Sequence, residues 1–129
     1  MASIGDAVIA TDLSGKVTFM NGVAEELTGW KLNEASLKPV KEIFNIVNEQ
    51  TRIVVEDPVS KVLEKGMIVG LANQTVLIRK NKTEIAIEDS GSPIKDKEGK
   101  TTGACLYSEI SPNAKKLRNY FENKLHLLT

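Results

Sequence analysis

Two polar turns of the same kind, one near each end of the chain, most restrict the fold that this sequence can adopt. The turns are Asp12-Leu13-Ser14-Gly15 and Asp96-Lys97-Glu98-Gly99. In each turn the first aspartate can accept hydrogen bonds from the backbone that follows, and the glycine tolerates a positive φ. Strand-like runs flank both turns, and Val17 and Phe19 are expected on one face of the second strand. Because short turns join antiparallel strands, the sequence predicts a hairpin at each end.

Between the two hairpins, apolar residues recur at the spacing of helices. Asn21 is a favourable N-cap for a first helix, which ends at Gly29. A second amphipathic stretch begins near Pro39. Its apolar residues at helical spacing are Val40, Ile43, Phe44 and Val47. Asp57-Pro58 predicts the start of a third helix. Asp is a good N-cap, and Pro suits the first helical position because an amide there would have no partner within the helix. Gly66 predicts the end of this helix.

In the second half of the chain, the apolar period becomes that of strands. Strands are predicted over residues 69–79 and from Ile85 onward, with a polar turn at Asn81-Lys82, and over Thr101–Ile110. The last strand has Ala104, Leu106 and Ile110 on one face and Cys105 and Tyr107 on the other. The order is therefore two strands, three short helices and three strands. One apolar face per strand indicates an antiparallel sheet with helices on one side, which is an α+β domain.

Residues 112–129 form a separate segment after the domain of residues 1–111, and they are predicted to be an amphipathic helix. Ser111-Pro112 repeats the start signal of the third helix. The apolar stripe that follows consists of Leu117, Tyr120, Phe121, Leu125 and Leu128. A helix over residues 112–128 would be about 25 Å long at roughly 1.5 Å per residue. Its stripe either pairs with a second subunit or folds back over the open face of its own sheet, and the sequence leaves both interpretations open.

The composition excludes several classes of protein. The 129 residues suffice for one core, and 17 basic side chains balance 17 acidic ones, so the chain lacks the basic excess of a nucleic-acid binder. Its apolar runs are too short to span a membrane. Cys105 is its only cysteine, so no disulfide framework is possible. A cytoplasmic domain without direct membrane contact is expected.

The sequence shows no catalytic arrangement. Glu88 and Asp89 are neighbours, so on a strand their side chains point to opposite faces and cannot act together as an acid–base pair. No metal-ligand cluster, phosphate-binding glycine loop or nucleophile–histidine pattern is present in the sequence. The chain is therefore expected to be non-catalytic.

Two ordered sets of residues resemble bacterial and archaeal PAS domains. The first set is Asp6-Ala7-Val8-Ile9-Ala10-Thr11-Asp12, Gly15, Val17, Asn21, Ala24 and Thr28-Gly29-Trp30. The second set is Asp57-Pro58-Val59, Gly70-Leu71-Ala72-Asn73-Gln74-Thr75, Glu88-Asp89-Ser90, Pro93-Ile94, Gly99 and Gly103. Each piece alone is weak, but the ordered set over residues 4–111 is specific, and the chain is identified as a member of the PAS family.

The resemblance implies a PAS fold, with a five-stranded antiparallel sheet in the order 2-1-5-4-3 and short helices on one face around a small pocket. Domains of this family often form homodimers. They lie before output domains of the same polypeptide, such as a histidine kinase or a diguanylate cyclase, and relay a change through a C-terminal helix. Relatives often carry Asp-Ile-Thr before that helix. Glu109-Ile110-Ser111 keeps the acid and the hydroxyl, although the usual aspartate is absent.

The resemblance also bears on cofactors, and none is expected. Haem-binding relatives often place a ligating His on the third helix, but residues 58–65 contain none and His126 lies on the terminal helix. Photosensors of this fold form a flavin adduct with a Cys on that same helix, whereas Cys105 lies on the last strand. Trp30 occupies a position where flavin-binding relatives often carry an aromatic residue, so non-covalent flavin binding stays open.

Five residues are candidates for contact with an unknown small molecule. They are Trp30, Asn73, Gln74, Asp89 and Ser90. The four polar ones lie on adjacent predicted strands, where they could donate or accept hydrogen bonds to a ligand. The same residues could instead form a solvated sheet face or support turns.

Together these features predict a signal-sensing and dimerisation module of a larger signal-transduction protein, either a sensor histidine kinase or a diguanylate cyclase. A ligand or an interface change would alter the geometry of its flanking helices. The alternative is a ligand-independent scaffold that fixes the dimer register or binds a partner protein. A ligand that raises thermal stability would distinguish the sensor from the scaffold.

Overall fold

The structure is a computed structural model, and it describes residues 6–68 and 75–111. The strands of this part are β1 (Ala7–Asp12), β2 (Val17–Met20), β3 (Asn45–Asn48), β4 (Thr75–Ile78), β5 (Glu84–Lys95) and β6 (Thr101–Ile110). Its helices are α1 (Gly22–Thr28), α2 (Leu32–Ala35), α3 (Val40–Ile43) and α4 (Pro58–Lys65). The strands form one six-stranded sheet in the order β2-β1-β6-β5-β4-β3, and every neighbouring pair is antiparallel. The predicted C-terminal helix lies outside the described residues.

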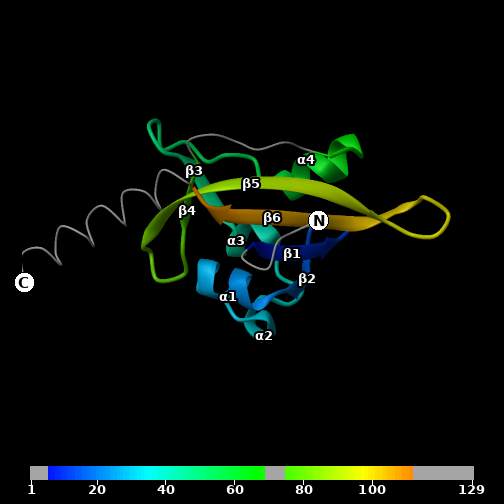
Figure 1. Cartoon of the computed structure of the whole chain (residues 1–129), viewed down its shortest axis with the longest axis horizontal. Helices are drawn as coiled ribbons and strands as arrows, with labels where there is room; N and C mark the ends of the chain where they lie inside the picture. The colour runs from blue at the N-terminus through cyan, green and yellow to red at the C-terminus, as the bar shows by residue number, and fades with distance from the viewer. Residues whose placement is uncertain (1–5, 69–74, 112–129) are drawn as a thin grey trace, which may run out of the picture.

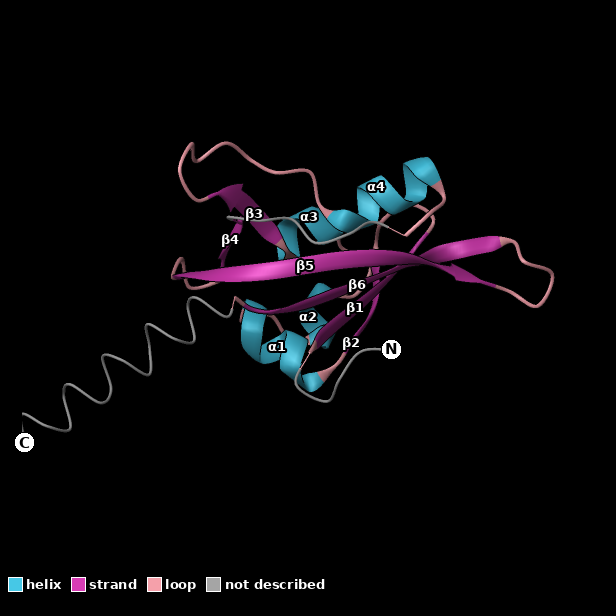
Figure 2. Cartoon of the chain, turned by 45° about the horizontal axis from the view of Figure 1, so that its top comes forward, coloured by secondary structure: helices cyan, strands magenta, loops and turns pink. Residues whose placement is uncertain are grey.

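The predicted α+β class and strand order are confirmed. The five predicted strands correspond to β2-β1-β6-β5-β4, and β3 adds a sixth strand at the edge beside β4. Figure 1 shows α4 near β5, whereas α1 and α2 lie near β1 and β2. The same arrangement is seen after a rotation in Figure 2. None of the helices in the described residues is long and apolar enough to cross a lipid bilayer.

The predicted caps and turns are also confirmed. The side chain of Asn21 accepts a hydrogen bond from the amide of Ala24 at the start of α1, and Gly29 ends that helix at φ 80°. The side chain of Asp12 accepts hydrogen bonds from the amides of Ser14 and Lys16. These local contacts mark the ends of α1 and the β1–β2 turn, and they are of the kind that a sequence pattern can predict.

The prediction of one helix from Pro39 through Val47 is wrong. Helix α3 ends at Ile43, Phe44 leaves the helical conformation at φ −112° and ψ 72°, and β3 follows at once. The apolar residues of this stretch fit either period, and pairing with β4 decides between them because Ile46 and Val47 lie opposite Leu77 and Val76. The short helix α2 was not predicted.

The expectation that Val17 and Phe19 share a face is also wrong. Phe19 lies opposite Ala10, but Val17 lies opposite Thr11, so a bulge at Thr18 interrupts the register. The extra residue turns the strand by one position, so Val17 is fully buried while Phe19 is 48% exposed. Phe19 therefore belongs to the open face of the sheet.

The core lies between one face of the sheet and the helices. Its strand residues include Ile9, Ile46, Leu77, Ile87 and Leu106, and its helix residues include Leu27, Ile43, Val59 and Val62. As predicted, Ala104 and Leu106 of β6 are buried on this face, whereas Cys105 and Tyr107 on the opposite face are half-buried. Burial of these apolar side chains is the main force that holds the helices on the sheet.

Two glycines allow close approaches between segments of the core. A Cβ on Gly91 of β5 would lie 3.0 Å from side-chain atoms of both Pro58 and Val62, so glycine lets α4 lie directly on the strand. A Cβ on Gly103 of β6 would lie 2.0 Å from the carbonyl oxygen of Thr11 on β1. No side chain can therefore replace the hydrogen at Gly103 without moving the backbone.

We predict that Gly103→Ala destabilises the domain by about 3 kcal/mol or more, as a severe case of overpacking. Gly22→Ala is the matched control, because nothing lies within 4 Å of an added Cβ at the first residue of α1. The control should leave stability unchanged or raise it by up to about 1 kcal/mol. Urea unfolding followed by the fluorescence of Trp30, the single tryptophan, measures both effects. Equal effects of the two variants would contradict the pairing of β1 with β6.

We also predict that Cys105 reacts slowly with alkylating agents. Burial raises the pKa of its thiol, and a hydrogen bond with Tyr107 offsets only part of that effect. Because the thiolate is the reactive form, the pH profile of reaction with iodoacetamide should have a midpoint above that of a free cysteine. Tyr107→Phe should shift the midpoint further upward. A midpoint at or below that of a free cysteine would show that Cys105 is an activated thiol instead.

Candidate functional site

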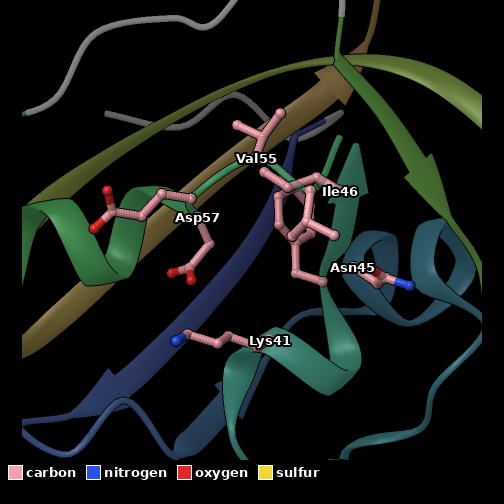
Figure 3. A pocket seen from close by; sticks show the side chains of 8 residues that line it. Lys41, Asn45, Ile46, Val55 and Asp57 are labelled. Carbon is pink, nitrogen blue, oxygen red and sulfur yellow. The ribbon is translucent and has the colours of Figure 1, made fainter. Parts of the chain in front are cut away.

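A cavity of about 290 Å³ lies between α3, β3 and the segment that leads into α4 (Figure 3). Its lining residues are Lys41, Phe44, Asn45, Ile46, Val54, Val55, Glu56 and Asp57. Small-molecule sites in proteins usually have volumes of roughly 300–1,000 Å³, so this cavity suits a ligand at the small end of that range. It is the candidate functional site.

One wall of the cavity is made by a tight hairpin after β3. The side chain of Asn48 accepts hydrogen bonds from the amides of Gln50 and Thr51, and Arg52 then adopts a left-handed conformation at φ 63°. The chain returns antiparallel to β3, where the amide of Val55 donates a 3.0 Å hydrogen bond to the carbonyl of Ile46. The hairpin thus places the side chains of residues 54 and 55 beside those of β3.

The opposite wall is made by the start of α4. Asp57 is the N-cap: its Oδ1 accepts a 2.8 Å hydrogen bond from the amide of Ser60, and its Oδ2 accepts a 2.9 Å hydrogen bond from the Ser60 hydroxyl. Pro58 follows at the first helical position. The cap therefore holds the Asp57 carboxyl group at the N-terminal end of α4, beside the cavity.

The cavity has an apolar floor and a charged rim. Phe44 and Ile46 are each 1% exposed, and Val55 is half-buried beside them. On the rim, Lys41 and Glu56 are exposed, whereas Asp57 is only 3% exposed. Figure 3 shows the Lys41 side chain extending from α3 so that its nitrogen lies below the Asp57 carboxylate in this view. Such a site can bind a small molecule that has both an apolar part and charged groups.

The facing charges of the cavity are not joined by an ion pair. Within residues 6–68 and 75–111, the ion pairs with a nitrogen–oxygen distance up to 4.0 Å are Arg52–Glu84 and Lys80–Glu34. Lys41 and Asp57 are therefore separated by more than a direct contact. The described residues also contain no group of three or more His, Cys, Asp or Glu side chains that could hold a metal ion.

Trp30, a predicted ligand contact, lies outside the cavity lining. Two lysine side chains lie over its ring, with the Nζ of Lys80 at 4.7 Å and that of Lys38 at 5.2 Å from the ring centre. Lys80 also donates a hydrogen bond to Glu34, and this bond is the main cause that lowers the pKa of the Glu34 carboxyl group. Trp30 thus joins the helical region to the β4–β5 turn, and its role in ligand binding stays a prediction.

Of the four predicted polar contacts the structure describes two, Asp89 and Ser90, and these lie on opposite faces of β5. Asp89 is 1% exposed and lies on the helix-facing side of β5, opposite Ser108 of β6. Ser90 lies on the other face of the sheet, opposite Tyr107. Asn73 and Gln74 lie outside the described residues. The ligand-binding role of all four stays a prediction, and the cavity is lined by a different set of residues.

Sequence reasoning missed the cavity because its walls meet only in the folded chain. The sequence predicts Asp57 as a helix cap and as part of the family resemblance, not as a residue of a cavity, and it predicts a helix through residues Phe44 to Val47. One local signal could have located the site. Two short apolar runs, one after Lys41 and one just before Glu56-Asp57, are separated by a polar turn. This pattern is typical of a hairpin, which would bring the charged residues at its two ends close together.

Comparison with known proteins gives a consistent result. Residues 1–107 match the protein family described as the PAS fold. Over 125 residues, the chain is 27% identical to the probable diguanylate cyclase DgcE of Escherichia coli (strain K12), a match that covers 96% of this chain. The match covers only 11% of the length of DgcE.

Solved structures show the same fold at low sequence identity. The PAS domain of nitrogen regulation protein NR(II) from Vibrio parahaemolyticus has a TM-score of 0.63 at 11% identity, covering 84% of this chain and 92% of that one. The light-state dimer of the fungal blue-light photoreceptor Vivid has a TM-score of 0.64 at 15% identity, covering 84% of this chain and 79% of that one. With the match over residues 1–107, the fold places this chain in the PAS family.

Proposed function

We propose that this chain is the signal-sensing and dimerisation module of a larger signal-transduction protein, and that the cavity beside α4 receives its small-molecule ligand. The observation that carries the proposal is the cavity itself: a buried apolar floor lies below charged groups of both signs that form no ion pair with one another in the described part of the chain. Charged groups beside an apolar surface suit a ligand that has both polar and apolar parts.

A path of direct contacts leads from the cavity to the end of the sheet. Helix α4, whose cap forms one wall, packs on β5 at Gly91. Gly91 lies opposite Leu106 of β6, and β6 runs on to Ile110, which precedes the predicted output helix. A ligand can shift this path between two conformations only if it binds them with unequal affinity. We propose that it does so by moving the start of α4.

The relatives support a role inside a longer polypeptide. The match covers 11% of the length of DgcE. In a parent protein built like DgcE, a cyclase activity would therefore belong to other domains. We propose that the parent protein carries a diguanylate cyclase or histidine kinase output domain, that this domain is itself non-catalytic, and that it is cytoplasmic. We also propose that it senses without haem or a flavin adduct, because residues 58–65 contain neither His nor Cys.

The ligand can be sought directly in protein purified without denaturation. We predict that native mass spectrometry shows a bound small molecule, or that a metabolite library contains a ligand that raises the melting temperature. Val55→Trp, which fills the cavity, should abolish either signal. Ile53→Trp is the matched control, because Ile53 is 68% exposed and does not line the cavity. If neither method finds a ligand for the wild-type chain, the ligand-independent scaffold becomes the better account.

Dimerisation is tested separately. The apolar stripe predicted over residues 112–129 pairs with a second subunit in this proposal, and the structure of Vivid is described as a dimer. We predict that deletion of residues 112–129 weakens self-association at least tenfold, because the deletion removes five apolar side chains of the stripe. Sedimentation equilibrium of the full chain and the shortened chain measures this effect. An unchanged association constant would show that the dimer contact lies elsewhere or does not form.

A further inference from the structure

We propose that the cavity recognises a small zwitterion, namely an amino acid with an apolar side chain. The inference rests on the proposed function, because it takes the cavity to be the ligand site. It goes further by assigning a charged group of the ligand to each side of the cavity.

The spacing of the rim charges carries the first step. In Figure 3 the Lys41 nitrogen lies below the Asp57 carboxylate, yet the two groups form no ion pair within 4.0 Å. A ligand carboxylate can accept hydrogen bonds from the Lys41 ammonium, while a ligand ammonium donates to Asp57. A molecule that bears both groups therefore spans the gap that the protein leaves between its own charges.

The signs of the rim charges favour a ligand that carries both a positive and a negative group. The rim has one cation, Lys41, and two carboxylates, Glu56 and Asp57. A simple anion would meet repulsion from both carboxylates, whereas a simple cation would be attracted by the carboxylates but would leave the Lys41 ammonium without an anionic partner. A neutral ligand would cover these charges without pairing them, which is costly. A zwitterion satisfies both signs at once.

Asp57 has acceptor capacity left for a ligand. Each of its oxygens accepts one hydrogen bond from Ser60, and an ionised carboxylate can accept about four in all. Because Ser60 and the rest of α4 hold this side chain in place, it loses little conformational freedom on binding. The carboxylate is thus already oriented for a donor in the cavity.

The floor sets the third requirement. Phe44, Ile46 and Val55 offer an apolar surface, so the ligand needs an aliphatic or aromatic side chain to cover it. A cavity of about 290 Å³ limits that side chain to the size found in the common apolar amino acids. Glycine, which has no side chain, should bind poorly.

Calorimetric titration of the full chain tests the class of ligand. The probes are L-leucine, L-methionine and L-phenylalanine, with glycine as the probe that lacks an apolar part. Two further probes each lack one charge of leucine: 3-methylbutylamine has no carboxylate, and 4-methylpentanoate has no ammonium. We expect one of the apolar amino acids to bind, and both of the one-charge leucine analogues to bind at least about tenfold more weakly than leucine.

Two substitutions assign the charges. Lys41→Met should weaken leucine binding by about tenfold to a hundredfold while leaving 3-methylbutylamine binding unchanged. Asp57→Asn keeps a capping side chain for α4 but removes the charge, so it should weaken leucine binding while leaving 4-methylpentanoate binding unchanged or tighter. Lys97→Met, in the exposed turn between β5 and β6, is the control and should change neither.

The outcomes separate this inference from the proposed function. Two outcomes would show that the zwitterion assignment is wrong while the cavity is still a ligand site. In the first, 3-methylbutylamine binds as tightly as leucine. In the second, a molecule that is not a zwitterion binds to the wild-type chain and no longer binds to the Val55→Trp variant. If no probe, library compound or co-purified molecule binds, the ligand-site function fails and the inference fails with it.

Discussion

The contact between α4 and β5 at Gly91 is the constraint on which the candidate site depends. An added Cβ there would lie 3.0 Å from Pro58 and from Val62, so the helix can approach the strand this closely only because the residue is glycine. Asp57 comes directly before the helix, so the same contact places the cap that forms one wall of the cavity. A larger residue at Gly91 would lift the start of α4 and displace that wall.

This contact also links the cavity, through β5, to β6, the strand that precedes residues 112–129. Gly91 lies opposite Leu106, and Leu106 lies opposite Ile9 at the centre of the sheet. The amide of Ser111, directly after β6, donates a hydrogen bond to the carbonyl of Ala86 on β5. In the proposed mechanism, a small movement of α4 displaces β5 at Gly91, and β5 in turn displaces β6, with which it pairs. Only these two contacts separate the cavity from the end of β6.

Helix caps and tight turns, which depend on neighbouring residues, could be predicted from the sequence. Strand β3 and the cavity, which depend on contacts between distant segments, could not. Asn21 and Asp57 were recognisable as caps because a cap needs one type of side chain at one position. The apolar residues of 40–47 fit both a helix and a strand, and pairing with β4 ends the helix at Ile43 and selects the strand from Asn45 onward. The cavity escaped prediction for the same reason, since it forms when Val55 folds back onto Ile46.

Hydrogen–deuterium exchange of the full chain, with and without the ligand found in the cavity, tests the central claim most directly. If the ligand acts by moving the start of α4 against β5, exchange should slow in residues 58–65 and should also change in residues 106–111 at the end of β6. A change confined to residues 41–57, with no effect on β6, would show that the cavity binds its ligand without passing a signal to the sheet.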